Sequence, residues 1–202
     1  MAQAVAAPSS GIKLGPLLPL DTKSIVGSVL LAVCFSINMQ ITERLDNLTG
    51  VAIAPVTGVP LANWLGYMFL NLWYPVAVIF FGLTGALIIS NFNPIIAIMT
   101  ATHPLAWSFF FFNMAWAIPN TFVFRYWIQT GKELTMRRFI LTCGIGQFFA
   151  AVMFVILMLV VAPGAQPWVY FAIPFWNWIM FIPGGYLGYH FFNAVRNSGV
   201  LE

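Results

Sequence analysis

The chain has 202 residues, of which 61% are hydrophobic and only 6% are charged, and its net charge at pH 7 is +3. This composition excludes an ordinary soluble domain, because a soluble surface needs many charged side chains to stay hydrated. The few basic residues form no long cluster, so the charge does not indicate a nucleic-acid partner. A mean hydropathy of +0.90 is typical of a protein embedded in the lipid bilayer.

Two long runs contain no Asp, Glu, Lys or Arg. They cover residues 47–124 and 139–195, and a short basic segment separates them. Each run is far longer than the roughly 20 residues with which one helix crosses a bilayer. The pattern therefore predicts an all-α bundle of six transmembrane helices over residues 24–202, preceded by an N-terminal arm.

The arm, residues 1–23, contains three prolines and lacks the pattern of a secretory signal, so we expect it to be disordered or to lie on the surface. We expect a loop at residues 42–58, a kink at Pro75, a break at residues 91–94, and a basic loop at residues 128–138. The six predicted crossings are residues 24–41, 59–81, 82–99, 105–127, 139–162 and 168–192.

The distribution of basic residues predicts the orientation, because cytoplasmic loops carry the excess of Lys and Arg. Six crossings place both termini on one side, and we expect that side to be the cytoplasmic face of the plasma membrane. An odd number of crossings would move only Arg196 outside, so five or seven crossings remain open. The predicted inner side holds Lys13, Lys23, Arg125, Lys132, Arg137, Arg138 and Arg196, and the outer side holds only Arg44.

Amide and aromatic residues gather near the predicted outer ends of several crossings. Together they could hold a flat, polar small molecule by stacking and hydrogen bonding. The alternative for each tryptophan is an aromatic belt at the membrane interface. The candidate substrate-binding residues are Asn38, Gln40, Glu43, Asn63, Trp64, Trp107, Trp168 and Asn177.

Further amides lie deeper in the predicted membrane region. Hydrogen bonds between helices explain them without a ligand, and we favour that interpretation. No carboxylate accompanies them, so a proton or cation pathway through the middle has little support. These residues are Asn71, Asn91, Asn93, Asn113 and Gln147.

The remaining reactive side chains form no recognisable catalytic or metal site. His103 and His190 fall near opposite faces; each could ligate the magnesium of a chlorin, although a structural hydrogen bond is the commoner role of a lone histidine. Cys34 and Cys143 show no metal-binding spacing, and we expect both to be small buried residues. Without a nucleotide-binding loop or a catalytic triad spacing, we expect the chain not to be an enzyme, and to hold no metal or cofactor of its own.

Small residues recur every four positions in the first predicted crossing and so lie on one helix face. Such a stripe lets another helix approach closely. It either packs inside the bundle or forms a docking face for a partner protein. The stripe consists of Ser24, Ser28, Ala32 and Ser36.

This arrangement resembles the S component of an energy-coupling factor (ECF) vitamin transporter, most closely the YkoE type. The stripe stands where that family has AxxxA, Gly82-Leu83-Thr84-Gly85-Ala86-Leu87 is similar to its Gly-Ala segment, and residues 193–201 are similar to its tail. The resemblance implies a subunit that captures thiamine or its hydroxymethylpyrimidine precursor. It also implies that the stripe contacts a membrane coupling subunit, which works with two ATPases.

A second hypothesis is an accessory subunit of a larger photosynthetic or respiratory membrane complex. The 20 Phe and 8 Trp residues of the chain, and the few charges near the predicted pocket, would suit a scaffold for pigment, quinone or lipid. Under this alternative the cofactor would be a chlorin or a carotenoid. A self-contained channel is disfavoured because the sequence offers no charged pore ring.

Overall fold

The computed structural model describes residues 12, 14–57, 61–101, 106–161, 163–164, 166–167 and 169–199. Within these ranges the chain is helical and contains no strand, so the all-α prediction is confirmed. The elements are α1 (Thr22–Thr57), α2 (Leu61–Met99), the short 3-10 helix η1 (Ala106–Ser108), α3 (Phe109–Gln129), α4 (Met136–Val161), α5 (Val169–Ile179) and α6 (Phe181–Ser198).

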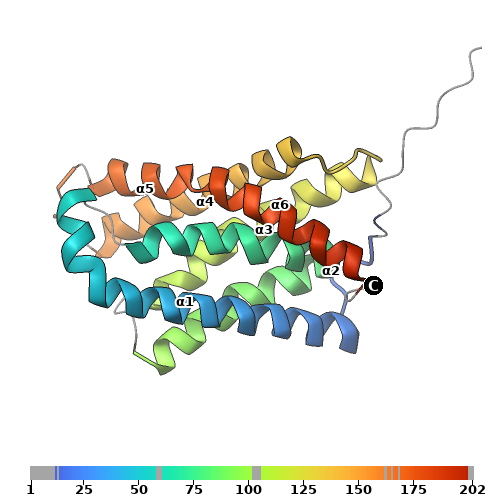
Figure 1. Cartoon of the computed structure of the whole chain (residues 1–202), viewed down its shortest axis with the longest axis horizontal. Coiled ribbons are helices and arrows are strands. Elements are labelled where there is room, and N and C mark those ends of the chain that lie inside the picture. The colour runs from blue at the N-terminus through green and yellow to red at the C-terminus, as the bar shows by residue number, and fades with distance from the viewer. Residues whose placement is uncertain are drawn as a thin grey trace, which may run out of the picture.

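Three of the described helices are long and apolar enough to cross a membrane, namely Thr22–Leu45, Leu65–Met99 and Met136–Val161. The expectation of a membrane protein with transmembrane helices is therefore supported by the structure. Figure 1 shows α1, α3, α4 and the α5–α6 pair lying along the long axis of one bundle, with the start of α1 and the end of α6 at the same end.

The chain reverses direction within α2, so this element consists of two packed halves. Gly82 leaves the helical conformation with φ 55° and ψ −138°, which glycine adopts without the steric cost of a Cβ. The Tyr74 hydroxyl in the first half donates a hydrogen bond to the carbonyl of Ile89 in the second, at 3.3 Å. The predicted boundary at residues 81 and 82 is therefore confirmed.

The break predicted at residues 91–94 is wrong, because the helix continues through Pro94 to Met99. Pro75 also lies inside the helix, and the kink expected there stays a prediction. Proline removes one helix hydrogen bond, which an interior helix position tolerates when neighbouring helices pack against the freed carbonyl. At Pro75 that carbonyl belongs to Asn71, and Gly188 of α6 lies directly against it.

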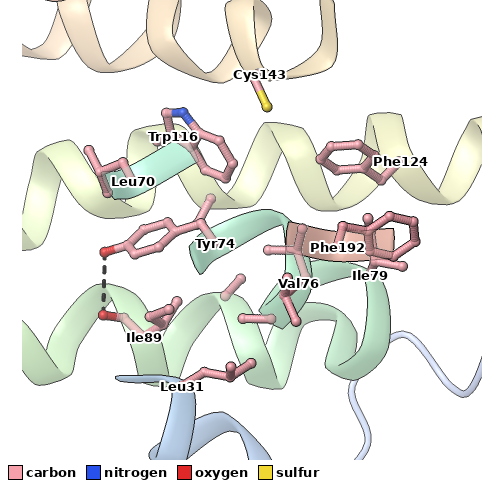
Figure 2. Packing of buried hydrophobic residues seen from close by; sticks show 14 of the residues in the cluster. Leu31, Leu70, Tyr74, Val76, Ile79, Ile89, Trp116, Phe124, Cys143 and Phe192 are labelled. Carbon is pink, nitrogen blue, oxygen red and sulfur yellow. Dashed lines mark hydrogen bonds between the residues drawn. The ribbon is translucent and has the colours of Figure 1, made fainter. Parts of the chain in front are cut away.

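The core is a chain of buried aromatic rings that connects most of the helices. Tyr74 of α2 meets Phe35 of α1 edge-on at 5.0 Å and Trp116 of α3 at 5.4 Å between ring centroids. Toward the other end, Phe139 of α4 contacts Phe124 at 5.1 Å. Figure 2 shows Tyr74 between Trp116 and Ile89, and Cys143 on the α4 side of the cluster. Edge-to-face pairs contribute about 0.5–1.5 kcal/mol each beyond their buried area.

The stripe of small residues on α1 lies inside the protein. Ser24, Ser28, Ala32 and Ser36 are at most 7% exposed. Beside the stripe, a side chain at Gly27 would overlap the ring of Phe81 in α2, which shows how closely the two helices approach. Side chains buried within the chain offer no surface to a partner, so the structure favours packing inside the bundle over the docking face.

The predicted loop at residues 42–58 is not a loop over most of its length, because α1 continues to Thr57. The Thr42 hydroxyl donates a hydrogen bond to the carbonyl of Asn38 within this helix at 2.7 Å. The continuation buries Glu43, which is 4% exposed. A residue expected at a wet helix end is therefore part of the interior.

Part of the N-terminal arm is ordered against the helices at the end where α1 begins. The backbone N–H of Leu83 donates to the carbonyl of Leu17 at 2.8 Å, and the Thr84 hydroxyl donates to the carbonyl of Pro19. The Arg125 guanidinium bonds two arm carbonyls, at 2.9 and 3.2 Å. Residues 14–20 thus cover the turn at Gly82, which agrees with the surface-lying alternative.

Asp21 begins the first helix in the manner of an N-cap residue. Its carboxylate accepts hydrogen bonds from the Ser24 hydroxyl at 2.7 Å and from the Ser24 backbone N–H at 2.9 Å. The bond from the hydroxyl is the larger cause, and together the two hold the pKa of Asp21 below its usual value. The arm therefore ends, and the membrane-length part of α1 begins, at a defined cap.

Candidate binding cavity

A cavity of about 250 Å³ lies inside one end of the bundle. Its lining includes Glu43 of α1, Gly66 of α2 and Val161 of α4, which stand far along the chain from the start of α1 and the end of α6. Helices α1, α2, α3, α4 and α5 all contribute to its walls. The lining residues are Phe35, Met39, Glu43, Gly66, Tyr67, Leu70, Asn93, Ser108, Phe109, Phe112, Asn113, Phe154, Leu157, Met158, Val161 and Ile173.

Aromatic and aliphatic side chains form most of the wall. Phe112 of α3 stacks on Phe154 of α4 with ring centroids 5.7 Å apart, so one side of the cavity is a pair of flat rings. On another side Gly66 leaves room for Met39, whose terminal carbon is 3.0 Å from where a Cβ would lie. A mostly apolar wall with a few polar groups is the usual construction of a small-molecule site.

The polar groups of the cavity include two that accept hydrogen bonds. Glu43 contributes a carboxylate, which is held by the side-chain amide of Gln40 at 3.4 Å. Asn93 is 1% exposed, and its side-chain oxygen has no hydrogen-bond partner among the described residues. A buried acceptor without a partner costs about 1–3 kcal/mol, so a ligand carrying a donor would be stabilised there. No described Lys or Arg lines the cavity.

The candidate residues of the sequence fall at different places around this cavity. Glu43 lines it, and Gln40 lies behind Glu43 on a neighbouring groove. Asn38 is half-buried on α1 and does not line the cavity. Trp107 of η1 is 41% exposed and packs edge-on against Phe111 at 6.3 Å, outside the cavity.

Asn177 of α5 is fully buried, and its backbone carbonyl accepts a hydrogen bond from Gln147. It is not among the residues that line the cavity. Three other candidates, the side chains of Asn63 and Trp64 and the residue Trp168, lie outside the described residues.

The sequence reasoning missed the aromatic wall. Phe35, Tyr67, Phe112 and Phe154 line the cavity, but they stand in runs that are apolar on every side. In such a run, the sequence does not distinguish a phenylalanine that faces a ligand from one that faces lipid. Asn93 was noticed, but as a residue for bonding between helices rather than for the cavity. The unpartnered oxygen that distinguishes it is visible only in the fold.

Hydrogen bonds between helices account for several of the deep amides, as expected. Asn71 of α2 donates to the side chain of Gln147 at 3.1 Å, and Gln147 donates to the carbonyl of Asn177 at 3.1 Å, so three helices are linked. Asn113 of α3 donates to the carbonyl of Ser90 at 3.1 Å. Asn91 instead bonds the carbonyl of Leu87 within its own helix.

The described histidine and the two cysteines lie on three different helices. His190 is exposed on α6, with its ring 4.7 Å from that of Tyr186. His103 lies outside the described residues. Cys143 is buried as expected, whereas Cys34 is exposed, which corrects the prediction for that residue. Among the described side chains, no group of three or more His, Cys, Asp or Glu residues is placed to hold a metal ion.

Taken together, the cavity can enclose a small, largely flat molecule. The aromatic wall would contact one of its faces, and the carboxylate of Glu43 and the oxygen of Asn93 would accept hydrogen bonds from its edge. Comparison with models of protein families, with curated proteins and with solved structures found no match to this chain.

Proposed function

We propose that this chain is the membrane-embedded substrate-capture subunit of a transporter, and that it holds a small vitamin-like molecule in the cavity. The observation that carries the proposal is the cavity of about 250 Å³, whose apolar wall contains the carboxylate of Glu43 and the unpartnered oxygen of Asn93. Small-molecule sites are commonly built in this way, and the volume suits a ligand of one or two rings.

The sequence resemblance makes the proposal more specific. It points to an ECF-type transporter, in which a membrane coupling subunit and two ATPases supply the energy and the substrate-capture subunit only binds. Thiamine and its hydroxymethylpyrimidine precursor are the ligands that the resemblance implies. An aminopyrimidine ring is flat and carries N–H donors, so it would complement both the ring pair and the two acceptors.

The proposal includes six membrane crossings, with both halves of α2 counted separately and α5 and α6 forming the last. It places the termini in the cytoplasm and the cavity near the outer face of the plasma membrane. The Lys and Arg distribution supports this orientation. The reversal of α2 at Gly82 supports the count, because each half then has nearly the length of one crossing.

Cysteine labelling tests this topology. Thr100, near the end of α2, and Lys132, between α3 and α4, are both exposed, and each is replaced by cysteine in a chain that carries Cys34→Ser. We expect a membrane-impermeant maleimide added to intact cells to label the Thr100→Cys chain but not the Lys132→Cys chain. Permeabilised cells provide the control, since both chains should then react. Labelling of both from outside contradicts the topology.

Ligand-induced stabilisation tests the binding proposal. A ligand present at 100 times its dissociation constant stabilises the folded state by about 2.7 kcal/mol. We therefore expect thiamine or hydroxymethylpyrimidine to raise the melting temperature of the purified protein by several degrees. Toluene, which is flat but has no N–H donor, is the control ligand and should produce a smaller rise.

The same preparation distinguishes the accessory-subunit alternative. A colourless protein that responds to the pyrimidine supports the capture subunit. A visible absorbance spectrum of bound chlorin or carotenoid, without any response to the pyrimidine, would contradict the capture proposal and support a pigment-holding subunit of a larger complex.

A further inference from the structure

A second concavity lies on the outside of the bundle, separate from the cavity. It is a groove of about 390 Å³ between α1 and the second half of α2. Its surface is almost entirely apolar, formed mainly by Val33, Ile37 and Ile41 of α1 and by Phe92 and Ile96 of α2. Arg44 lies on the same face of α1, at the end of the groove, and is exposed.

The groove has the length of one lipid tail in one leaflet. The membrane-length part of α1 is Thr22–Leu45, so Val33 lies at its middle and Arg44 at its end. At 1.5 Å per residue, the distance from Val33 to Arg44 along the helix is about 16 Å. Half of the hydrocarbon core of a bilayer is about 15 Å thick. A chain lying in the groove would therefore extend from the bilayer centre to the headgroup level.

Charge distinguishes the end of this groove from the rest of the nearby surface. Between residues 24 and 124, Arg44 is the only Lys or Arg in the sequence. A guanidinium binds phosphate through two parallel hydrogen bonds, and it does so more strongly at a membrane interface than in open water. The groove thus offers apolar side chains to a hydrocarbon chain. At the level of the headgroup it offers the Arg44 guanidinium to a phosphate.

A hydrogen bond also joins the two walls of the groove near its headgroup end. The Thr100 hydroxyl near the end of α2 donates to the side-chain oxygen of Gln40 in α1 at 3.3 Å. Gln40 in turn holds the Glu43 carboxylate of the cavity at 3.4 Å. The two helices that form the groove are therefore held together by a hydrogen bond at its polar end.

We propose that this groove binds an anionic phospholipid from the leaflet at that end of the bundle. One acyl chain lies between Ile37 and Phe92, and the phosphate is bound by Arg44. This site is independent of the proposed transport function, because it uses the outer surface of the bundle rather than the cavity. Lipids elsewhere around the protein exchange freely, whereas the lipid in the groove is held at both its chain and its phosphate.

Photo-crosslinking tests the proposal in the full-length protein. The protein is reconstituted into phosphatidylcholine vesicles that contain phosphatidylglycerol with a diazirine on its acyl chain, and the modified residues are mapped by mass spectrometry. Ile37→Trp fills the groove. Leu30→Trp is the matched control, because Leu30 is an exposed residue of the same helix outside the groove, at 61% against 54% for Ile37.

We expect labelling to concentrate on the groove residues of the wild-type protein. The Leu30→Trp variant should show the same labelling pattern. Ile37→Trp should abolish labelling of Phe92 and Ile96. Arg44→Gln should reduce it roughly tenfold, the effect of losing charge-assisted hydrogen bonds to phosphate. Both tryptophans replace exposed side chains, and unchanged melting temperatures will show that the variants fold.

Three results would overturn the proposal. Labelling spread evenly over all exposed apolar faces and insensitive to Ile37→Trp would mean ordinary contact with bulk lipid. Labelling insensitive to Arg44→Gln would remove the phosphate site. Absence of lipid labelling in the groove, while other exposed apolar faces are labelled, would show that a second copy or another subunit occupies it.

Discussion

Replacing Gly188 with alanine is expected to destabilise the protein by about 1–3 kcal/mol, the usual cost of overpacking. A Cβ at this position would overlap the backbone carbonyl of Asn71 in α2. Backbone atoms cannot rotate away as a flexible side chain can, so α6 would have to move off α2. The thermal melting temperature of the detergent-solubilised protein measures the effect.

The direction of this change is informative, because alanine in a helix is otherwise favoured over glycine by up to about 1 kcal/mol. At an open helix position, replacing glycine with alanine would therefore raise the stability of the protein. Only a close contact at that position makes the same substitution destabilising. Asn197→Ala, at an exposed position of the same helix, is the matched control and should leave the melting temperature nearly unchanged. A Gly188→Ala protein as stable as the wild type would show that α6 and α2 do not meet in this way.

The contact at Gly188 also explains how α2 tolerates Pro75. Proline has no N–H for the carbonyl of Asn71, four residues before it, and that carbonyl faces Gly188 instead of a helix donor. The Asn71 side chain bonds the carbonyl of Tyr67 and the amide of Gln147, at 2.8 and 3.1 Å. Helix packing and side-chain bonds thus support the interrupted backbone, which is why Pro75 does not end the helix.

Replacing Glu43 with glutamine is expected to weaken ligand binding by roughly tenfold to a hundredfold. Glutamine keeps the size of the side chain but replaces charge-assisted hydrogen bonds, worth about 1.5–3 kcal/mol each, with weaker neutral ones. Titration calorimetry with thiamine or hydroxymethylpyrimidine measures the dissociation constant. A fold-change of this size corresponds to about 1.4–2.8 kcal/mol.

The control for Glu43→Gln is Glu133→Gln, the same chemical change on an exposed residue between α3 and α4, far from the cavity lining. It should leave both the affinity and the melting temperature unchanged. Equal affinities for the Glu43→Gln and wild-type proteins would show that the carboxylate does not touch the ligand. Binding would then have to depend on contacts with the aromatic wall alone.

Most of the helical architecture could be read from the residue pattern. Uncharged runs longer than one crossing predict several membrane helices, and the predicted segments at 105–127 and 139–162 agree closely with α3 and α4. The turn at Gly82 was also placed correctly. The loop predicted at residues 42–58 was wrong because its charges suggested exposure to water, whereas the fold buries Glu43 in a cavity.

The cavity itself could be predicted only in part. Glu43 stood out because it is the main carboxylate near the predicted outer end of the first crossing. Trp107 stood out for its residue type, but it packs at the rim against Phe111 and does not enter the cavity. The stripe on α1 indicated a close helix contact correctly, although only the structure shows that α2 of the same chain provides it.

By itself, the sequence determined that the chain is helical and belongs in a bilayer, because composition alone sets whether water or lipid can solvate its surface. The tertiary structure decided which faces of the helices meet one another and which line the cavity. In a membrane helix both the buried and the lipid-facing sides are apolar, so periodicity does not separate them. Asn91 and Asn93 differ by two positions on α2, about 200° around the helix. One bonds its own helix and the other lines the cavity, and only the packing of the neighbouring helices distinguishes them.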